Sequence, residues 1–331
     1  MNTPDSLHYI AQGESQTRQF IDAETVFLAL QSAQLAAKEV RGSMFWRVLR
    51  GKNTLIQTTA HGAQTSLGIE SDTTRLLFEA FIRRKSALEE RRTALAAQLL
   101  MQTRLNRALR VGRVPTIVVD VLNAFCKAGL DEHFMVIGTH ALYAYEQAAG
   151  VRINEKALAT RDVDFLFDAR KRVAFVSAIG QLDGGLIGVL KKADASFEIV
   201  EGQLYTARNK DGFEVDVLRR QAAGDDPHPW RLSDNEDDFW AVQISTEEKL
   251  QSARRFDQVV VATSGSMGLM RTIHPLDFAR IKQNLGNLLN RDPNKSGKDL
   301  YQAQLLRVLV DERLPHLALK PETDIDPIAS A

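Results

Sequence analysis

The segment Thr160-Arg161-Asp162-Val163-Asp164-Phe165-Leu166-Phe167-Asp168 decides the fold of this chain. Its apolar residues Val163, Phe165 and Phe167 recur at every second position, which is typical of a β-strand with one buried face. The same period of two places Asp162 and Asp164 together on the opposite face, roughly 6–7 Å apart along the strand. The sequence therefore predicts a strand whose two carboxylates can hold the same divalent cation.

Two other segments give this strand a context. The apolar run Phe134–Leu142 contains a Gly-Thr pair and continues into residues that suit a helix. The segment Phe213–Leu218 alternates again and has Asp216 in its middle. We expect segments 198–208 and 213–219 to form a hairpin, which places the Asp216 strand in a mixed sheet beside the first strand.

The order of these motifs resembles the minimal nucleotidyltransferase fold of the DNA polymerase β superfamily. More narrowly, four segments resemble a bacterial nucleotidyltransferase-like family: Gly138–Leu142, Ala159–Asp164, His274–Ala279 and Arg291–Pro293. The resemblance extends from about residue 43 to about residue 309. It implies an α/β (α+β) fold with a polymerase-β-like core and a mixed sheet, flanked by an N-terminal helical region and a C-terminal strand-helix region.

We expect four parts along the chain: a mainly helical region at 1–112, the nucleotidyltransferase core at 113–224, a strand-helix region at 225–320 and a flexible tail at 321–331. The helical region includes amphipathic stretches at 20–39 and 71–110. The number of residues between Gly138 and Asp162 is large for this superfamily, which predicts a long helix and an extra loop at 150–159. A second Asp-x-Asp, Asp324–Asp326, lies in the tail without a strand around it, and we interpret it as a decoy.

The resemblance implies a transferase of the EC 2.7.7 type that moves NMP from an NTP to an acceptor hydroxyl and releases pyrophosphate. Such chemistry uses two Mg²⁺ (or Mn²⁺) ions about 3.5–4 Å apart, and three carboxylates can hold both. In this scheme Asp162 and Asp164 ligate the ions. Asp216 ligates the ion that activates the acceptor hydroxyl, and it can take the proton of that hydroxyl.

The triphosphate needs its own contacts. Gly138 lets the backbone approach the phosphates, and the Thr139 hydroxyl can bind their oxygens. His140 either contacts phosphate or metal or caps the following helix. The first candidate for a cation on the triphosphate is Lys282, by resemblance to the family's downstream lysine, and Arg161 is a weaker one.

Composition gives broader limits. The 331 residues include 42 Lys and Arg against 42 Asp and Glu, so no overall basic charge indicates a nucleic-acid partner. Basic residues are in excess in segment 71–110, and segment Gly42–Lys52 combines basic and aromatic residues. Each of these two segments either contacts a polyanion or is an ordinary solvated surface. One cysteine, Cys126, excludes an internal disulfide, and no apolar run approaches the ~20 residues of a membrane span. We expect a cytoplasmic protein without membrane contact.

Several alternatives stay open. The acceptor can be RNA, in particular a tRNA end, a protein hydroxyl or a small molecule, since relatives with this core serve all three. By resemblance, a toxin or a component of a toxin–antitoxin or defence system is also possible. The competing functions are a non-catalytic nucleotide- or RNA-binding module on a degenerate fold and a metal-dependent nuclease. The preferred NTP, the oligomeric state and any antitoxin partner are not determined by the sequence.

Overall fold

The structure is a computed structural model that describes residues 8–59, 62–168, 172–219, 229–233, 235, 238–243 and 253–318. The chain forms two compact units. The core unit comprises Met1–Glu14 and Gly112–Ala331, and the inserted unit comprises Ser15–Val111. The Asp324–Asp326 motif and the tail at 321–331 lie outside the described residues. Among the residues described, no helix is long and apolar enough to cross a membrane.

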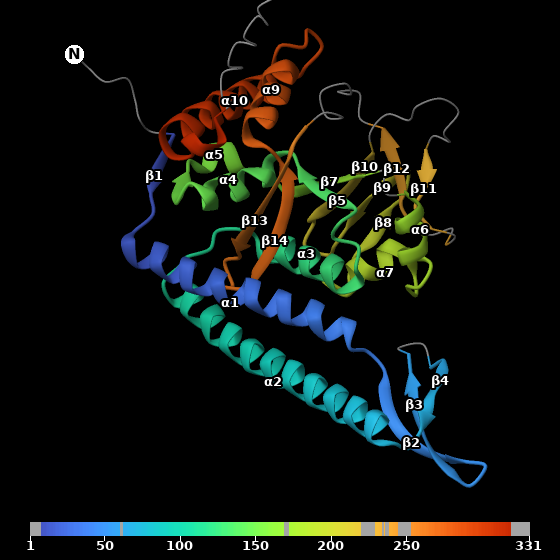
Figure 1. Ribbon diagram of the computed structural model, residues 1–331. Coiled ribbons are helices and arrows are strands. Elements are labelled where there is room, and N and C mark those ends of the chain that lie inside the picture. Colours follow the sequence, from blue (N-terminus) through green and yellow to red (C-terminus); the bar gives the residue numbers. More distant parts are fainter. Residues whose placement is uncertain are drawn as a thin grey trace, which may run out of the picture. The chain divides into compact units, whose positions relative to one another are not determined.

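Seven strands of the described chain form a mixed sheet in the core unit (Figure 1). They are β5 Phe134–Ile137, β7 Asp162–Phe167, β8 Glu198–Val200, β9 Gln203–Arg208, β10 Glu214–Arg219, β11 Trp230–Arg231 and β12 Trp240–Gln243. The order is β11-β12-β10-β7-β5, with β9 pairing β10 and β8 pairing β9. Strand β10 runs parallel to β7 and to β12, whereas β5 is antiparallel to β7. The predicted mixed sheet, with the Asp216 strand beside the Asp162 strand, is confirmed.

Helices and hairpins complete the core unit. The helices are α3 Thr116–Ala128, α4 Leu142–Ala148, α5 Glu155–Leu158, α6 Arg172–Ile179, α7 Gly185–Lys191, α9 Pro275–Gly286 and α10 Pro293–Arg313, with 3₁₀ turns η1 Thr139–Ala141 and η3 Pro315–Leu317. Strands β13 Arg255–Val261 and β14 Met267–Ile273 form a separate hairpin. Strand β1 Tyr9–Ala11 pairs with β6 Val151–Ile153. Because β1 precedes the inserted unit and α3 follows it, Ser15–Val111 interrupts the core unit in sequence.

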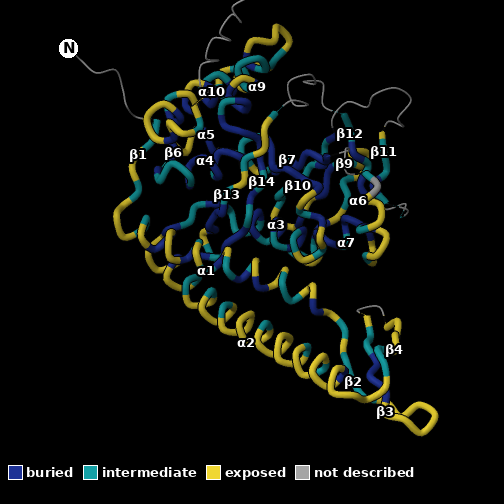
Figure 2. The backbone as a smooth tube through the Cα atoms, viewed as in Figure 1, coloured by how far each residue is buried: buried dark blue, intermediate teal, exposed yellow. Residues whose placement is uncertain are grey.

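The face of β7 predicted to be apolar is buried. Val163, Phe165 and Phe167 are each at most 1% exposed. The ring of Phe165 lies 4.9 Å from that of Phe125 on α3, and the ring of Phe167 lies 4.7 Å from that of Phe175 on α6. Since α3 and α6 cover this face, the alternation of the strand leaves Asp162 and Asp164 on the other face, where both are half-buried. Figure 2 shows that buried residues are frequent in the elements of the core unit, whereas α2 Asp72–Ala108 is mostly exposed.

Two details differ from the sequence predictions. The segment 150–159, predicted as a loop, contains β6 and α5, because the backbone of β6 pairs with β1. The helix after Gly138 is short rather than long, since α4 ends at Ala148. Elsewhere in the core unit, the Gly184-Gly185 pair starts α7, whose Leu186 and Ile187 amides donate to the buried Asp238 carboxylate at 2.8 and 2.9 Å.

The inserted unit consists of two long antiparallel helices and a small sheet. Its helices are α1 Glu14–Glu39 and α2 Asp72–Ala108, and its strands are β2 Ser43–Leu49, β3 Lys52–Thr58 and β4 Gln64–Ile69. Gln19 on α1 donates to Gln102 on α2 at 2.6 Å, and Arg84 on α2 pairs with Glu39 on α1 at 3.5 Å. The two helices agree with prediction, whereas the sequence analysis assigned no strands here.

The aromatic packing under β7 generates a test of the fold. Phe165→Ala removes a fully buried ring between α3 and β5, and the cavity left behind should cost about 3–5 kcal/mol of unfolding free energy. Leu204→Ala on β9 is the matched control, because Leu204 is 46% exposed and its loss should cost less than about 1 kcal/mol. Urea denaturation measures both. Similar losses for the two variants would mean that this cluster does not hold the sheet together.

Candidate active site

Three carboxylates meet on the open face of the sheet. In the register of the strands, Asp216 on β10 lies opposite Asp164 on β7. One oxygen from each of Asp162, Asp164 and Asp216 lies within 4.8 Å of the others. The predicted triad is therefore a single cluster. Its formation follows from the parallel pairing of two strands that each place their acids on the same face.

Gly138 is held against this cluster. It follows β5 directly, and its φ of +67° is a conformation that L side chains rarely adopt. A Cβ at this position would lie 2.1 Å from Oδ2 of Asp164, too close for any side chain. The glycine is needed both for the turn and for the approach of the backbone to the carboxylate. Thr139 follows it in η1 and is half-buried, and its Oγ1 accepts a hydrogen bond from Gln302 on α10 at 3.4 Å.

Neighbouring side chains fix the carboxylates and the start of β7. The Thr206 hydroxyl on β9 donates to Oδ1 of Asp216 at 2.6 Å. The Thr160 hydroxyl donates to Oδ1 of Asp162. The buried ring of His140 donates from Nδ1 to the main-chain oxygen of Asp162 at 2.9 Å, and burial lowers the His140 pKa to about 4. In the structure His140 thus lies in the core as a neutral group that positions the strand, and it caps no helix.

The cluster is electrostatically crowded. Burial, together with repulsion from Asp162 and Asp216, raises the pKa of Asp164 to about 7, although the positive charge of Lys282 lowers it. Burial also raises the pKa of Asp216, against the hydrogen bond from Thr206. Carboxylate oxygens are the ligands that Mg²⁺ and Mn²⁺ prefer, and three of them lie close together here. A divalent cation would relieve the repulsion, so these residues fit such an ion.

The positive charge of Lys282 on α9 acts on the cluster, because it lowers the pKa of Asp164. Its Nζ pairs with Oδ1 of the buried Asp299 at 2.7 Å and lies 5.6 Å from the Phe278 ring centre. Asp299 also accepts from Arg291 at 2.7 Å. Lys298 on α10 donates to the main-chain oxygen of Ala159 at 2.7 Å. These contacts hold the ammonium groups of Lys282 and Lys298 beside the acids.

Arg161 lies elsewhere. It precedes β7, and its exposed side chain lines a separate cavity of about 700 Å³ with Asp120, Lys210 and Phe213. None of the three acids is among the residues that line this cavity. Of the residues that the sequence analysis grouped at the site, the structure brings together Asp162, Asp164, Asp216 and Gly138 with Lys282 nearby, and separates Arg161.

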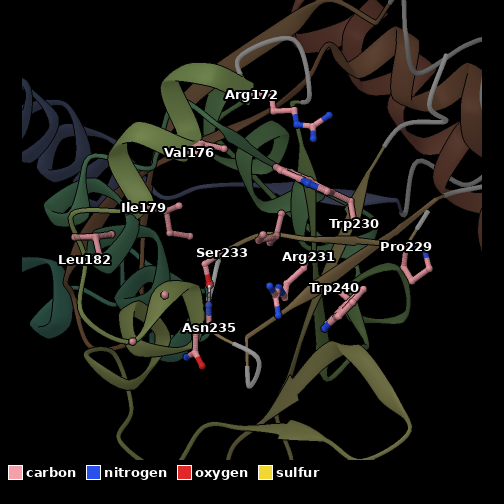
Figure 3. A pocket seen from close by; sticks show the side chains of 14 residues that line it. Arg172, Val176, Ile179, Leu182, Pro229, Trp230, Arg231, Ser233, Asn235 and Trp240 are labelled. Atoms are coloured by element: carbon pink, nitrogen blue, oxygen red, sulfur yellow. Dashed lines mark hydrogen bonds between the residues drawn. The ribbon is translucent and has the colours of Figure 1, made fainter. Parts of the chain in front are cut away.

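A second cavity, of about 510 Å³, lies near the C-terminal end of β7 (Figure 3). Arg172, Trp230, Arg231 and Trp240 line it, and the Arg172 guanidinium stacks 4.8 Å from the Trp230 ring centre. Trp230 packs on Phe167, the last residue of β7, whereas the acids lie at its beginning. This cavity is therefore not the acid cluster.

Comparison with known proteins agrees with this geometry. Residues 116–324, well over half of the chain, match the model of a family described as Nucleotidyltransferase. The chain belongs to the Nucleotidyltransferase family. No curated protein and no solved structure matches it. The family match spans β5, β7, β10 and α9, and thus all the elements that build the acid cluster of the nucleotidyltransferase.

Sequence reasoning missed several residues that support the nucleotidyltransferase site. In the structure Arg208 pairs with Glu214, and Thr206 therefore lies opposite Asp216. The hairpin predicted from segments 198–208 and 213–219 would instead pair Thr206 with Val215, so a shift of one residue in register concealed Thr206. Asp299 and Gln302 gave no signal in the sequence, since they reach the site through α10, far away in sequence.

The close approach at Gly138 predicts a loss of metal binding when a methyl group is added. Gly138→Ala should weaken Mn²⁺ binding by more than about tenfold, because the Cβ displaces the Asp164 carboxylate. Gly202→Ala is the control, since Gly202 also has a positive φ of +76° but a methyl group there would meet no atom within 4 Å. Isothermal titration calorimetry measures both. Unchanged Mn²⁺ affinity in Gly138→Ala would contradict this assignment of the glycine.

The raised pKa of Asp164 predicts how stability depends on pH without divalent ions. Between its ordinary value of 3.8 and about 7, the folded chain keeps a proton that the unfolded chain releases, so the free energy of unfolding falls as pH rises through this range. One pKa unit corresponds to about 1.4 kcal/mol, and we expect a fall of at least that size. In EDTA, wild type should lose more stability than Asp164→Asn between about pH 4 and about pH 8, measured by urea denaturation. Equal losses would argue against a buried, protonated Asp164.

Proposed function

We propose that this nucleotidyltransferase moves NMP from an NTP to an acceptor hydroxyl and releases pyrophosphate, in a reaction that depends on Mg²⁺ or Mn²⁺. The convergence of Asp162, Asp164 and Asp216 within 4.8 Å, against the backbone of Gly138, is the observation that carries the proposal. When bound there, divalent ions supply charge neutralisation for the attacking and leaving oxygens. Membership of the family supports transfer rather than hydrolysis by a nuclease.

The residues around the acids have distinct tasks in this proposal. Asp216 orients the acceptor hydroxyl and takes its proton, and the Thr206 hydroxyl keeps that carboxylate in position. Gly138 and Thr139 bring main-chain and hydroxyl groups towards the triphosphate. Lys282, held by Asp299, stabilises the negative charge that develops on the leaving pyrophosphate.

Two of the predicted contacts have different tasks. His140 acts on the site through the main chain of Asp162, because its ring is buried and its Nδ1 is already bonded. Arg161 does not act on the triphosphate, since it lines the neighbouring cavity. Lys282 on α9, the first candidate from the sequence, is therefore the cation that acts on the triphosphate, and Arg161 is not.

Carboxamide variants test catalysis without changing shape. Asp162→Asn and Asp216→Asn should each lower transfer of label from α-labelled NTPs by more than about 100-fold, because an amide neither binds divalent ions well nor accepts the proton. Asp311→Asn on α10 is the control, since Asp311 is exposed and lies outside the cluster. Transfer is measured with Mg²⁺ or Mn²⁺ in the presence of total RNA and cell lysate. Metal-dependent nucleotide binding with no transfer by wild type would instead support a non-catalytic binding module.

A further inference from the structure

The two units carry opposite charges. The inserted unit has 15 Lys and Arg residues against eight Asp and Glu, which gives a formal charge of +7. The core unit has 27 against 34, which gives −7. The neutral total of the chain conceals this separation. A positive charge concentrated on one unit favours a polyanionic partner for that unit, whereas the unit with the acid cluster repels polyanions.

Many of the cations of the inserted unit are exposed and lack carboxylate partners. Lys38, Arg41, Arg50, Lys52 and Arg83 are all exposed. Within the described part of the chain, none of their side chains forms an ion pair, in contrast to Arg75 and Arg92, which pair with Glu70 and Glu89. Cations that a fold has not neutralised remain available for phosphate groups.

Contacts between the two helices place Lys38 and Arg41, at the end of α1, near Arg83 of α2. Arg84 pairs with Glu39, and the Lys85 Nζ donates to the main-chain oxygen of Gly42 at 2.5 Å, so the C-terminal end of α1 lies beside residues 83–85 of α2. Strand β2 starts immediately after this point. We call this end the basic tip and define it by six residues: Lys38, Arg41, Arg47, Arg50, Lys52 and Arg83.

The hairpin of β2 and β3 carries three residues of the basic tip, Arg47, Arg50 and Lys52. Its two-residue turn, Arg50-Gly51, has positive φ at both positions, which suits the tight turn of a hairpin and exposes Arg50 at the apex. Trp46 anchors the ribbon through its ring contact of 5.9 Å with Phe78 on α2. The Arg47 guanidinium lies 5.1 Å from the ring centre of the half-buried Phe45. Cations beside partly exposed rings are the combination that binds single-stranded nucleic acid.

We propose that the basic tip binds RNA and that this RNA supplies the acceptor hydroxyl. The inference deepens the proposed function and rests on it for the role of the RNA, although binding itself does not depend on catalysis. A small or neutral acceptor needs no unit with a charge of +7 in the same chain as an acidic core unit. Among polynucleotides, RNA presents unpaired strands and free terminal hydroxyls, which match both the basic tip and the chemistry of transfer.

Salt-dependent binding by the full chain tests the inference. Fluorescence anisotropy with a labelled single-stranded RNA gives the affinity of wild type, of Arg41→Gln/Arg50→Gln/Arg83→Gln and of the matched control Lys191→Gln/Lys192→Gln/Arg307→Gln. The control removes the same charge from exposed positions of the core unit. The basic-tip variant should bind at least about tenfold more weakly, with the slope of log affinity against log salt reduced by about 2, since each phosphate contact contributes about 0.7. The control should change affinity less than about twofold.

The outcomes separate this inference from the proposed function. Equal losses in the two triple variants, tighter binding to DNA than to RNA, or no RNA binding by wild type would overturn the RNA assignment even if NMP transfer to another acceptor were found. RNA binding that is intact in Asp162→Asn, with label transferred to RNA only by wild type, would support it. RNA binding without any transfer by wild type would overturn the role of RNA as acceptor and the proposed transfer together, while the binding surface would stand.

Discussion

Repulsion between three carboxylates on one sheet face is the constraint on which the rest of the core unit depends. Burying Asp164 between Asp162 and Asp216 is unfavourable unless a proton or a cation compensates, which is why its pKa rises to about 7. A fold that only needed stability would place an apolar side chain there, as it does at Val163 and Phe165 one residue away on either side. The aromatic packing on the opposite face offsets this unfavourable arrangement and keeps β7 and β10 in register.

The supports of the site follow the same logic. Gly138 gives up a side chain so that Asp164 can lie against the backbone, and Thr206 gives Asp216 one fixed hydrogen bond. His140 uses a buried, uncharged ring to hold the main chain of Asp162, because a charged ring would require solvent or a partner. Each support thus acts on one of the three aspartates, either on its carboxylate or on its main chain.

The parts of the fold and of the candidate site that the sequence predicted are those that depend on contacts local in sequence. The strand with Asp162 and Asp164 and its pairing with the Asp216 strand followed from alternation, since strand geometry alone sets which residues share a face. Arg161, the weaker candidate for a cation on the triphosphate, precedes this strand and lines a separate cavity, which the alternation of the strand does not predict. The pairing of Lys282 with Asp299 depends on how α9 packs on α10, and no spacing in the sequence encodes that contact.

The separation of charge between the units resolves a conflict that the acid cluster creates. In the proposed reaction the triphosphate and the polynucleotide acceptor are both negative, so a core unit with a formal charge of −7 repels both of them unless cations are present. In the proposed reaction, divalent ions and Lys282 act at short range on the triphosphate, where a compact charge is needed. A long acceptor instead requires many spaced cations, and two antiparallel helices with a β-ribbon display them without enlarging the buried core. Interrupting the core between β1 and α3 adds such a surface while the strands that hold the acids keep their pairing.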